Sequence, residues 1–314
     1  MGNVLSALLP VFLIIGLGAV LRRSLLPDDV HWAALERLSY YILFPALLVI
    51  SIARADLGGV AVLGVCIALL GAIALMGTAL IFTRDWWCRR LRLSGPSYTS
   101  LFQGALRWNT YVGLAVSGSL AGPAGLAVAA VALTVMIPTL NTMSVMVLAR
   151  HGRNAAPGWT NMMAQVLRNP FIWSCAAGAI INAIHLPIPP VLMTFGDILG
   201  RSSLALGLLV VGAGLDLRSL RHPHRATFVS CALKLVVLPI LAVALGLACG
   251  LSGVDLTVVA VAASVPSAPN GYVLARQMGG DAPLLAEMLT LQTLSAAITM
   301  PMVIAAVERI QSYL

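Results

Sequence analysis

Charged residues are rare in this sequence. Only 10% of the 314 residues are Asp, Glu, Lys or Arg, whereas a soluble globular domain carries about 25%. Hydrophobic residues make up 60% of the chain, and the mean hydropathy is +0.96. Because a soluble fold of this length needs a charged surface, this composition excludes one and predicts an integral membrane protein.

Cysteine patterns of a disulfide framework or a zinc site are also missing. None of the five cysteines has C-x-x-C spacing, and four of them lie in apolar runs, where cysteine behaves as a small hydrophobe. We therefore expect no metal site and no cofactor. The first residues, MGNVLSALLP, lack a basic segment. We expect them to begin a membrane span rather than a cleaved signal peptide.

Carboxylates are absent from the centres of the apolar runs. Eleven residues are acidic, and those closest to membrane depth are Glu36, Asp197 and Glu287. No pair of them lies near a midplane, which disfavours a cation exchanger with a buried diacid site. Arg107 and the single lysine, Lys234, do lie inside apolar runs and favour an anionic cargo.

Ten apolar segments are long enough, or nearly so, to cross a bilayer as helices of about 20 residues. They predict an all-α membrane protein with ten transmembrane helices. The predicted spans cover residues 4–21, 32–52, 60–82, 98–120, 124–149, 170–186, 191–215, 227–251, 256–275 and 284–307.

The basic residues behind the net charge of +8 are shared unequally between alternate loops. Only Arg54 and Arg309 belong to one set. The other set holds thirteen: Arg22, Arg23, Arg84, Arg89, Arg90, Arg92, Arg150, Arg153, Arg168, Arg218, Arg221, Arg225 and Arg276. Because basic loops stay in the cytoplasm, we expect a bacterial inner (plasma) membrane protein with both termini on the outer, periplasmic side. No basic run is interleaved with aromatic residues, so we expect no nucleic-acid partner.

The two halves of the chain match at an offset of 160 residues. The matched pairs include Pro10 and Pro170, Gly18 and Gly178, Asp56-Leu57 and Asp216-Leu217 and, at an offset of 161, Asn109 and Asn270. Each half holds five predicted spans, and an odd number inverts the second half. The sequence therefore predicts an inverted repeat, typical of secondary transporters, with repeats at 1–149 and 166–314 and a cytoplasmic linker at 150–165.

The ninth span contains the stretch SVPSAPNGY at 264–272. Pro266 and Pro269 each remove a backbone donor, and Gly271 follows Asn270 directly. Pro266 lies about 15 Å into the span at 1.5 Å per residue, close to the bilayer centre. Since unpaired backbone groups are costly in lipid, we expect a broken helix that lines a polar cavity rather than a simple kink.

The fourth span is the symmetry mate of the ninth and contains ALRWNTYVGLAVSG at 105–118. It has no proline here, and a break is predicted from Asn109 and Thr110 between Gly104 and Gly113. Half-helices with N-termini at a shared centre would offer partial positive charge and free N–H groups to an anion.

Arg107 and Lys234 each have two interpretations. A lipid-facing arginine costs about 2.5 kcal/mol or more, so Arg107 should face the protein interior. There it is either a clamp for a substrate carboxylate or a structural group that binds broken-helix carbonyls or extends to the cytoplasm. Lys234 is a second cationic ligand or coupling residue, or a link to backbone carbonyls. In the fifth and tenth spans, Pro138, Asn141 and Gln292 could complete a polar cavity.

Five motifs together resemble those of the auxin efflux carrier family, which includes plant auxin exporters and bacterial carriers assigned to malonate and malate. They are RWNTYVGLA, IPTLN, KLVVLP, VPSAPNGYVLARQMGG and LQTLSAAITMP, in spans four, five, eight, nine and ten. The resemblance implies a fold like that of bile-acid symporters and sodium–proton antiporters, in which broken helices four and nine cross. It also implies a scaffold domain from spans one, two, six and seven, and a transport domain from the other six spans. An elevator mechanism and a homodimer through the scaffold follow from the same likeness.

The resemblance further implies a substrate site at the crossing. Its residues would be Asn109, Thr110, Pro138, Asn141, Pro266, Pro269, Asn270 and Gly271. Two features of plant members are missing: a proline in the fourth-span motif and a long cytoplasmic loop.

The expected function is secondary active transport of a small organic anion: a carboxylate, a dicarboxylate or an auxin-like anion. The expected partners are this anion, membrane lipid and a second copy of the chain. Coupling to H⁺ or Na⁺ is left open, and one alternative is a sodium-coupled organic anion symporter of the bile-acid type. An alternative of another class is a membrane sensor or enzyme, for which His222 and His224 are the best candidates.

Overall fold

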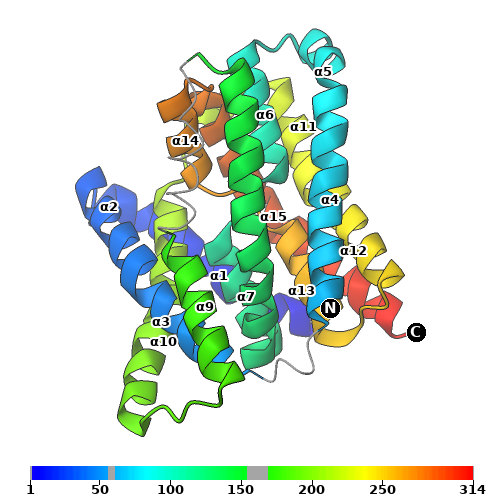
Figure 1. The fold of residues 1–314 in the computed structure, drawn as a ribbon. Coiled ribbons are helices and arrows are strands. Elements are labelled where there is room, and N and C mark those ends of the chain that lie inside the picture. The colour runs from blue at the N-terminus through cyan, green and yellow to red at the C-terminus, as the bar shows by residue number, and fades with distance from the viewer. Residues whose placement is uncertain (1, 56–60, 154–168, 314) are drawn as a thin grey trace.

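A computed structural model of the chain describes residues 2–55, 61–153 and 169–313. Helices are the only regular secondary structure in these ranges (Figure 1). Seven helical stretches are long and apolar enough to cross a membrane, and they confirm an all-α integral membrane protein. They are Val4–Ser24, Asp29–Ala53, Val62–Phe82, Gly95–His151, Pro190–Ala213, Arg225–Ala248 and Ala282–Gln311.

The seven stretches differ from the ten predicted spans in three places. The fourth and fifth spans follow each other closely as α6 (Gly95–Leu106) and α7 (Thr110–His151), and α7 is kinked at Gly122, where φ is 55°. The sixth is a short helix, α9 (Pro170–Ala183). The ninth is divided into α13 (Gly253–Ser264) and α14 (Asn270–Met278). Most of the predicted linker 150–165, and the Asp56-Leu57 pair, lie outside the described residues.

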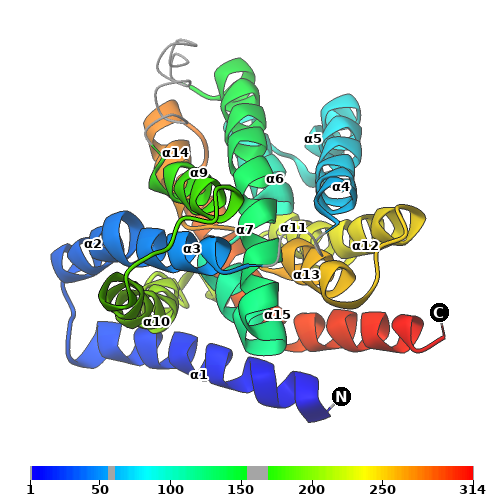
Figure 2. The same cartoon turned by 60° about the horizontal axis from the view of Figure 1, so that its bottom comes forward.

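The helices pack as pairs from opposite halves of the chain. Helix α1 (Gly2–Ser24) packs on α10 (Pro190–Ala213), α3 (Phe44–Ala53) on α9, and α4 (Val62–Phe82) on α12 (Leu238–Ala248). Figure 2 shows α2 (Asp29–Leu38), α3 and α10 on one side of α7, and α4, α12 and α13 on the other. The pairs α1 with α10 and α3 with α9 come from the predicted scaffold spans, whereas α4 and α12 come from predicted transport spans.

Glycines set the close approach of α1 and α10. A Cβ at Gly212 would lie 1.8 Å from the carbonyl oxygen of Ile15, and one at Gly18 would lie 2.1 Å from that of Leu209. Apolar side chains gain little from leaving lipid, so membrane helices associate largely through such close packing of small residues.

A second feature of the helices is a pair of π-helical stretches. Ser39–Leu43 joins α2 to α3, and Leu233–Val237 joins α11 (Arg225–Ala232) to α12. Each precedes a helix that carries a proline in its first turn, Pro45 or Pro239. Proline has no N–H to give to the preceding turn, which favours a wider turn there. These stretches contain Tyr40 and Lys234, respectively.

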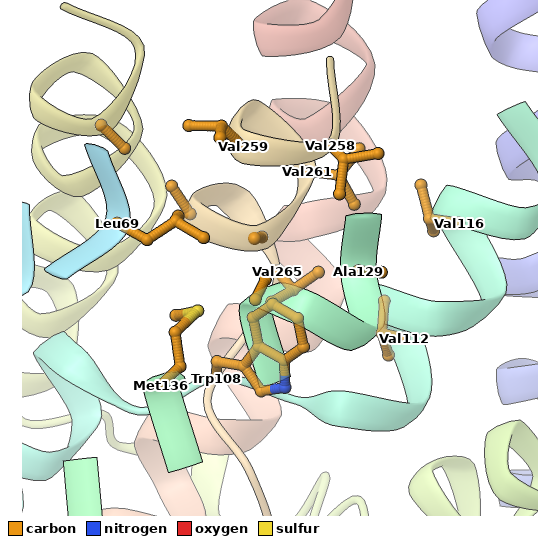
Figure 3. Close-up of a cluster of buried hydrophobic side chains, with 14 of the residues drawn as sticks. Leu69, Trp108, Val112, Val116, Ala129, Met136, Val258, Val259, Val261 and Val265 are labelled. Atoms are coloured by element: carbon orange, nitrogen blue, oxygen red, sulfur yellow. The ribbon is translucent and has the colours of Figure 1, made fainter. Parts of the chain in front are cut away.

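The core holds the break of the fourth span in place. Trp108, between α6 and α7, is 4% exposed and packs in one cluster with Val258, Val261 and Val265 from the ninth span (Figure 3). Gly113 leaves room for its ring, because a Cβ there would lie 3.3 Å from the indole. The hydrophobic core therefore joins the two broken spans directly.

Candidate substrate site at two helix breaks

Both predicted helix breaks are present, and they touch. Helix α6 ends at Leu106 and α7 begins at Thr110, while α13 ends at Ser264 and α14 begins at Asn270. The backbone N–H of Asn109 donates to the carbonyl of Pro266 at 2.9 Å. This bond pairs a donor freed by one break with an acceptor freed by the other.

Polar side chains from neighbouring helices pair with other freed backbone groups. The carbonyl of Gly104 accepts from the Ser267 hydroxyl at 2.6 Å and from Gln292 Nε2 at 2.9 Å. Gln292 Oε1 accepts from the Ser267 N–H at 3.0 Å. Lys234 Nζ donates to the carbonyl of Ala263 at 3.1 Å, at the C-terminal end of α13. An unbroken helix would have paired these carbonyls with backbone N–H groups. At the breaks, side-chain donors and other groups take that place.

Arg107 lies directly after α6 and is 4% exposed. Its Nη2 donates to Asn141 Oδ1 at 2.9 Å and to Asn270 Oδ1 at 3.1 Å, and its Nη1 donates to Gln103 Oε1 at 3.4 Å. All three acceptors are neutral amides, and no ion pair to Arg107 is found in the described residues. The positive charge at the breaks is therefore not neutralised by a neighbouring carboxylate of the described chain.

A cavity of about 320 Å³ opens beside Arg107. Arg107 and Asn270 line it from the two helix breaks, and Asn141 lines it from the fifth span. Glu36, Arg37 and Tyr40 line it from the second span. This volume lies at the lower end of the range of about 300–1,000 Å³ that is typical of ligand pockets, so the cavity has room for a small organic molecule. Two recesses of about 70 Å³ lie at the same residues and also include Asn109, Thr110, Pro269 and Asn169 in their walls.

The structure brings most, but not all, of the predicted site residues to these cavities. The residues that line at least one of them are Arg107, Asn109, Thr110, Asn141, Pro269 and Asn270. Gly271 lies behind Arg107, where a Cβ would come 2.9 Å from the arginine Cδ. Pro138, Pro266, Gln292 and Lys234 line none of these three cavities. Gln292 and Lys234 are fully buried and bind backbone carbonyls instead.

One expectation about the helix ends is wrong. The first N–H groups of α7 were expected to be free for an anion, but Asn109 Oδ1 accepts from Tyr111 N–H at 3.1 Å and from Val112 N–H at 3.3 Å. Asn109 is therefore the N-cap of α7, a role for which asparagine is strongly preferred. The positive charge available to a ligand here comes from two guanidinium groups, that of Arg107 and that of Arg37, which lines the same cavity.

Sequence patterns missed Tyr40, Asn169 and Phe171 as cavity residues. They lie in or beside the second and sixth spans, and Tyr40 packs edge-on against Phe171 with ring centroids 4.9 Å apart. Their only sequence signal is a polar or aromatic residue within an apolar run, for Tyr40, or near the start of one, for Asn169 and Phe171, and this is common in membrane helices.

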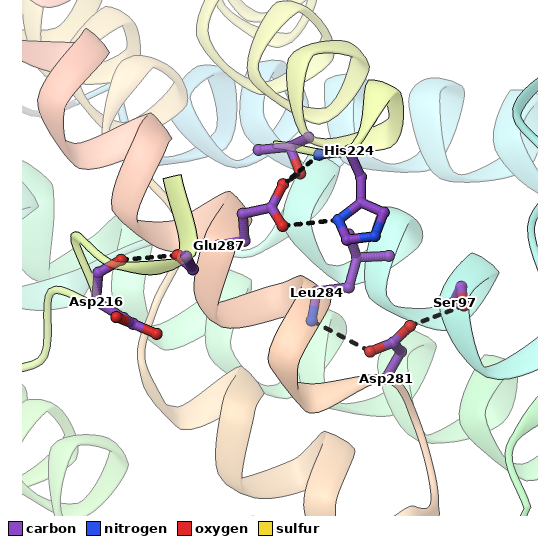
Figure 4. Close-up of polar contacts among 8 residues, drawn as sticks. Ser97, Asp216, His224, Asp281, Leu284 and Glu287 are labelled. Carbon is purple, nitrogen blue, oxygen red and sulfur yellow. Dashed lines mark hydrogen bonds and ion pairs between the residues drawn. The ribbon is translucent and has the colours of Figure 1, made fainter. Parts of the chain in front are cut away.

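His224 of the H-x-H pair lies at a different place, directly before α11 (Figure 4). Glu287 of α15 (Ala282–Gln311) is buried and accepts from the His224 N–H at 2.7 Å, and it contacts His224 Nδ1 at 2.8 Å and the Thr227 hydroxyl. Within the described residues, no group of three or more His, Cys, Asp or Glu could hold a metal. The carboxylate links α15 to the first turn of α11.

Comparisons with known proteins fit this architecture. Residues 159–304 match the family model described as Membrane transport protein. Over 305 residues the chain is 25% identical to a protein of Methanothermobacter thermautotrophicus named as an uncharacterized transporter, and the alignment covers 95% of this chain and 96% of the relative. Both matches support a member of a membrane transport family.

These two matches agree with the family resemblance that the motifs indicate. The matched region contains three of the five: KLVVLP, VPSAPNGYVLARQMGG and LQTLSAAITMP. The helix breaks and the cavity beside Arg107 are thus features of a transporter.

Proposed function

We propose that this transporter is a secondary active carrier of a small organic anion, a carboxylate or dicarboxylate, and not an enzyme. The observation that carries the proposal is Arg107, a buried guanidinium at the cavity wall whose acceptors are neutral amides. A substrate carboxylate would supply the missing negative charge, and guanidinium matches carboxylate in a bidentate geometry.

In this proposal the asparagines have a second role. Asn141 and Asn270 accept from Arg107 through their amide oxygens, which directs the guanidinium toward the cavity that both side chains line. Their amide nitrogens would then be donors for a second substrate oxygen. A dicarboxylate or an auxin-like anion would extend from this point toward Tyr40.

We further propose that the two halves form an inverted repeat of five spans each, with spans four and nine crossing at their breaks. Two matching glycine contacts support this. A Cβ at Gly18 would lie 2.1 Å from the carbonyl oxygen of Leu209, and a Cβ at Gly178 would lie 3.0 Å from that of Val49. The two contacts are related by the 160-residue offset with the halves exchanged, because Gly18 corresponds to Gly178 and Leu209 corresponds to Val49.

The proposed movement is elevator-type alternating access. Spans one, two, six and seven would form the scaffold, and the other six would carry the substrate past it. The cavities support this division, because their walls combine residues of spans four, five and nine with residues in or beside the second and sixth spans. Scaffold helix α1 has exposed Leu5, Leu9, Leu13 and Leu17 that would meet lipid or the second copy of a homodimer.

Arginine distribution supports an orientation in the bacterial inner membrane with both termini outside. Helix α5 (Arg84–Leu91) and the connection between α9 and α10 lie at opposite ends of the molecule in Figure 1, as this orientation requires.

A cation-coupled version of the same carrier is the second candidate. Glu36 lines the cavity that contains Arg107, so the site includes one carboxylate that H⁺ or Na⁺ could neutralise. Symport of the bile-acid type would use such a group. Uptake that requires Na⁺ and is lost in Glu36→Gln would favour this candidate.

Counterflow in proteoliposomes tests the carrier proposal. The purified protein would be loaded with one unlabelled anion from a panel that includes malonate, malate, short monocarboxylates and indole-3-acetate, and uptake of the labelled anion would be followed with and without Na⁺. Arg107→Gln removes the charge and should weaken the apparent affinity about 10- to 100-fold, since a charge-assisted hydrogen bond contributes about 1.5–3 kcal/mol. Arg107→Lys keeps the positive charge and should retain part of the affinity for the anion.

The matched control is Arg218→Gln, which removes an exposed arginine that lines none of these three cavities. It should transport like the parent protein. Full uptake by folded Arg107→Gln would contradict the anion site, and no counterflow of any anion by folded parent protein would contradict the carrier proposal.

A further inference from the structure

Four arginines gather around one open cavity away from the substrate site. The cavity measures about 640 Å³ and is lined by Arg89 and Arg90 of α5, by Arg92 just after it, and by Arg225 at the start of α11. All four side chains are exposed, and none forms an ion pair in the described part of the chain. The cavity is therefore a concentrated positive site without its own counter-charge.

Helix α5 is held so that its basic face points to this cavity. Trp87 and Leu91 are four residues apart and pack on a buried cluster that includes Leu101 and Ala226. On another face, Trp86, Arg89 and Arg90 follow the i, i+3, i+4 spacing of helical neighbours and line the cavity. These two partly buried side chains thus fix the orientation of the arginines.

Arg92 occupies a backbone position that favours glycine. It ends α5 with φ 54° and ψ 47°, in the left-handed region, and the next N–H, that of Leu93, donates to the Cys88 carbonyl at 3.0 Å. Helices commonly end with glycine in this conformation, because a Cβ is strained there. An arginine at this position, with its side chain at the cavity, indicates that the guanidinium is used.

We propose that this cavity binds the phosphate headgroup of an anionic phospholipid. The span α4 ends at Phe82, which is 84% exposed, and Trp86 one turn later is 52% exposed. A tryptophan directly after a span lies at headgroup level, and basic clusters there attract anionic lipids. Arginines bind phosphate in bidentate fashion.

A free phosphate would satisfy the arginines equally well, but it has no acyl chain to cover Phe82 and Trp86. The apolar surface next to the charges therefore favours the lipid. This inference does not rest on transport, because lipid binding is measured without any transported anion.

The test counts bound lipid by native mass spectrometry on the full chain in detergent. Phosphatidylglycerol, phosphatidylcholine and inorganic phosphate would be titrated in separate arms. We expect phosphatidylglycerol to be retained in preference to phosphatidylcholine. The double variant Arg89→Gln/Arg90→Gln should weaken this binding roughly 30-fold, from the attraction of about two arginines for an anionic lipid. The matched control, Arg218→Gln/Arg221→Gln, removes two exposed arginines that do not line the cavity and should bind like the parent.

Arg92→Gly provides an independent readout if the double variant does not fold. It should raise the unfolding temperature of the lipid-free protein, because it relieves the left-handed strain, and it should still weaken phosphatidylglycerol binding. Equal losses in the two double variants would overturn the proposal in favour of general charge attraction. Equal affinity for inorganic phosphate would overturn the lipid assignment, and equal retention of both lipids would overturn the headgroup site.

Discussion

At the scale of single residues, the site combines Arg107, which forms no ion pair in the described residues, with asparagines that have separate tasks. Asn141 and Asn270 accept from Arg107, whereas Asn109 caps α7 through its side chain and joins the two breaks through its backbone. Residue type alone could not separate these roles, since all three asparagines lie in polar motifs of the same kind. Their hydrogen bonds do separate them.

Asn109 therefore allows a test of charge without loss of the helix cap. Asn109→Asp and Asn109→Ser both retain an acceptor for the first N–H groups of α7, so both should fold with an unfolding temperature near that of the parent. Only the aspartate adds a negative charge to the cavity wall, and it should abolish anion counterflow while the serine variant retains it. Loss of a cap altogether, in Asn109→Ala, should cost about 0.5–2 kcal/mol of stability. Equal transport by the Asp and Ser variants would contradict an anionic substrate.

Lys234 is expected to act on stability rather than on substrate affinity. Its ammonium binds the Ala263 carbonyl, and its side chain lines none of the three cavities at the breaks. In Lys234→Met this carbonyl loses its donor, which should cost about 1–3 kcal/mol. Thermal unfolding should show the loss, and the KM for counterflow should be unchanged. A raised KM at unchanged stability would instead make Lys234 a ligand.

At the scale of helices, the breaks depend on groups outside the broken segments. Gln292 of α15 binds the Gly104 carbonyl and the Ser267 N–H, and thereby bridges α6 to the ninth-span break. The sequence indicated where the chain cannot continue as a helix, because proline removes a donor. It did not indicate which distant side chain replaces the missing partner, so Gln292 was predicted at the substrate and is found among the backbone links.

The contact between α1 and α10 gives a prediction with a control on the same helix. Gly18→Ala places a Cβ against the Leu209 carbonyl and should cost about 1–3 kcal/mol, typical of overpacking. Gly16→Ala, two residues earlier, meets nothing within 4 Å and should be neutral or stabilising by up to about 1 kcal/mol. Thermal unfolding in detergent measures both. A similar response of the two variants would contradict this helix contact.

At the scale of the whole molecule, orientation can be tested by cysteine labelling in a variant that lacks the native cysteines. Single cysteines at exposed Asp85 and Ser312 should label from the cytoplasmic side and the outer side, respectively. Native Cys88 is a poorer reporter, because burial raises the pKa of its thiol and the reactive thiolate is scarce at neutral pH. An impermeant maleimide on intact cells should therefore modify Ser312→Cys and leave Asp85→Cys unmodified until the cells are opened. The reverse pattern would contradict the orientation drawn from the arginines.

The sequence by itself determined the class of this protein, most of its membrane spans and the positions of both helix breaks. Each of these depends on local composition: the transfer of an apolar run into lipid, the loss of a backbone donor at proline in the ninth span, or polar residues between glycines in the fourth span. Tertiary structure decided which polar residues meet. It placed Glu36 and Tyr40 opposite Arg107, moved Gln292 and Lys234 to backbone carbonyls, and brought Arg225 to the arginines of α5. These contacts join residues that are far apart in the chain, so they depend on how the helices pack. Close approaches such as those at Gly18 and Gly212 help to fix that packing.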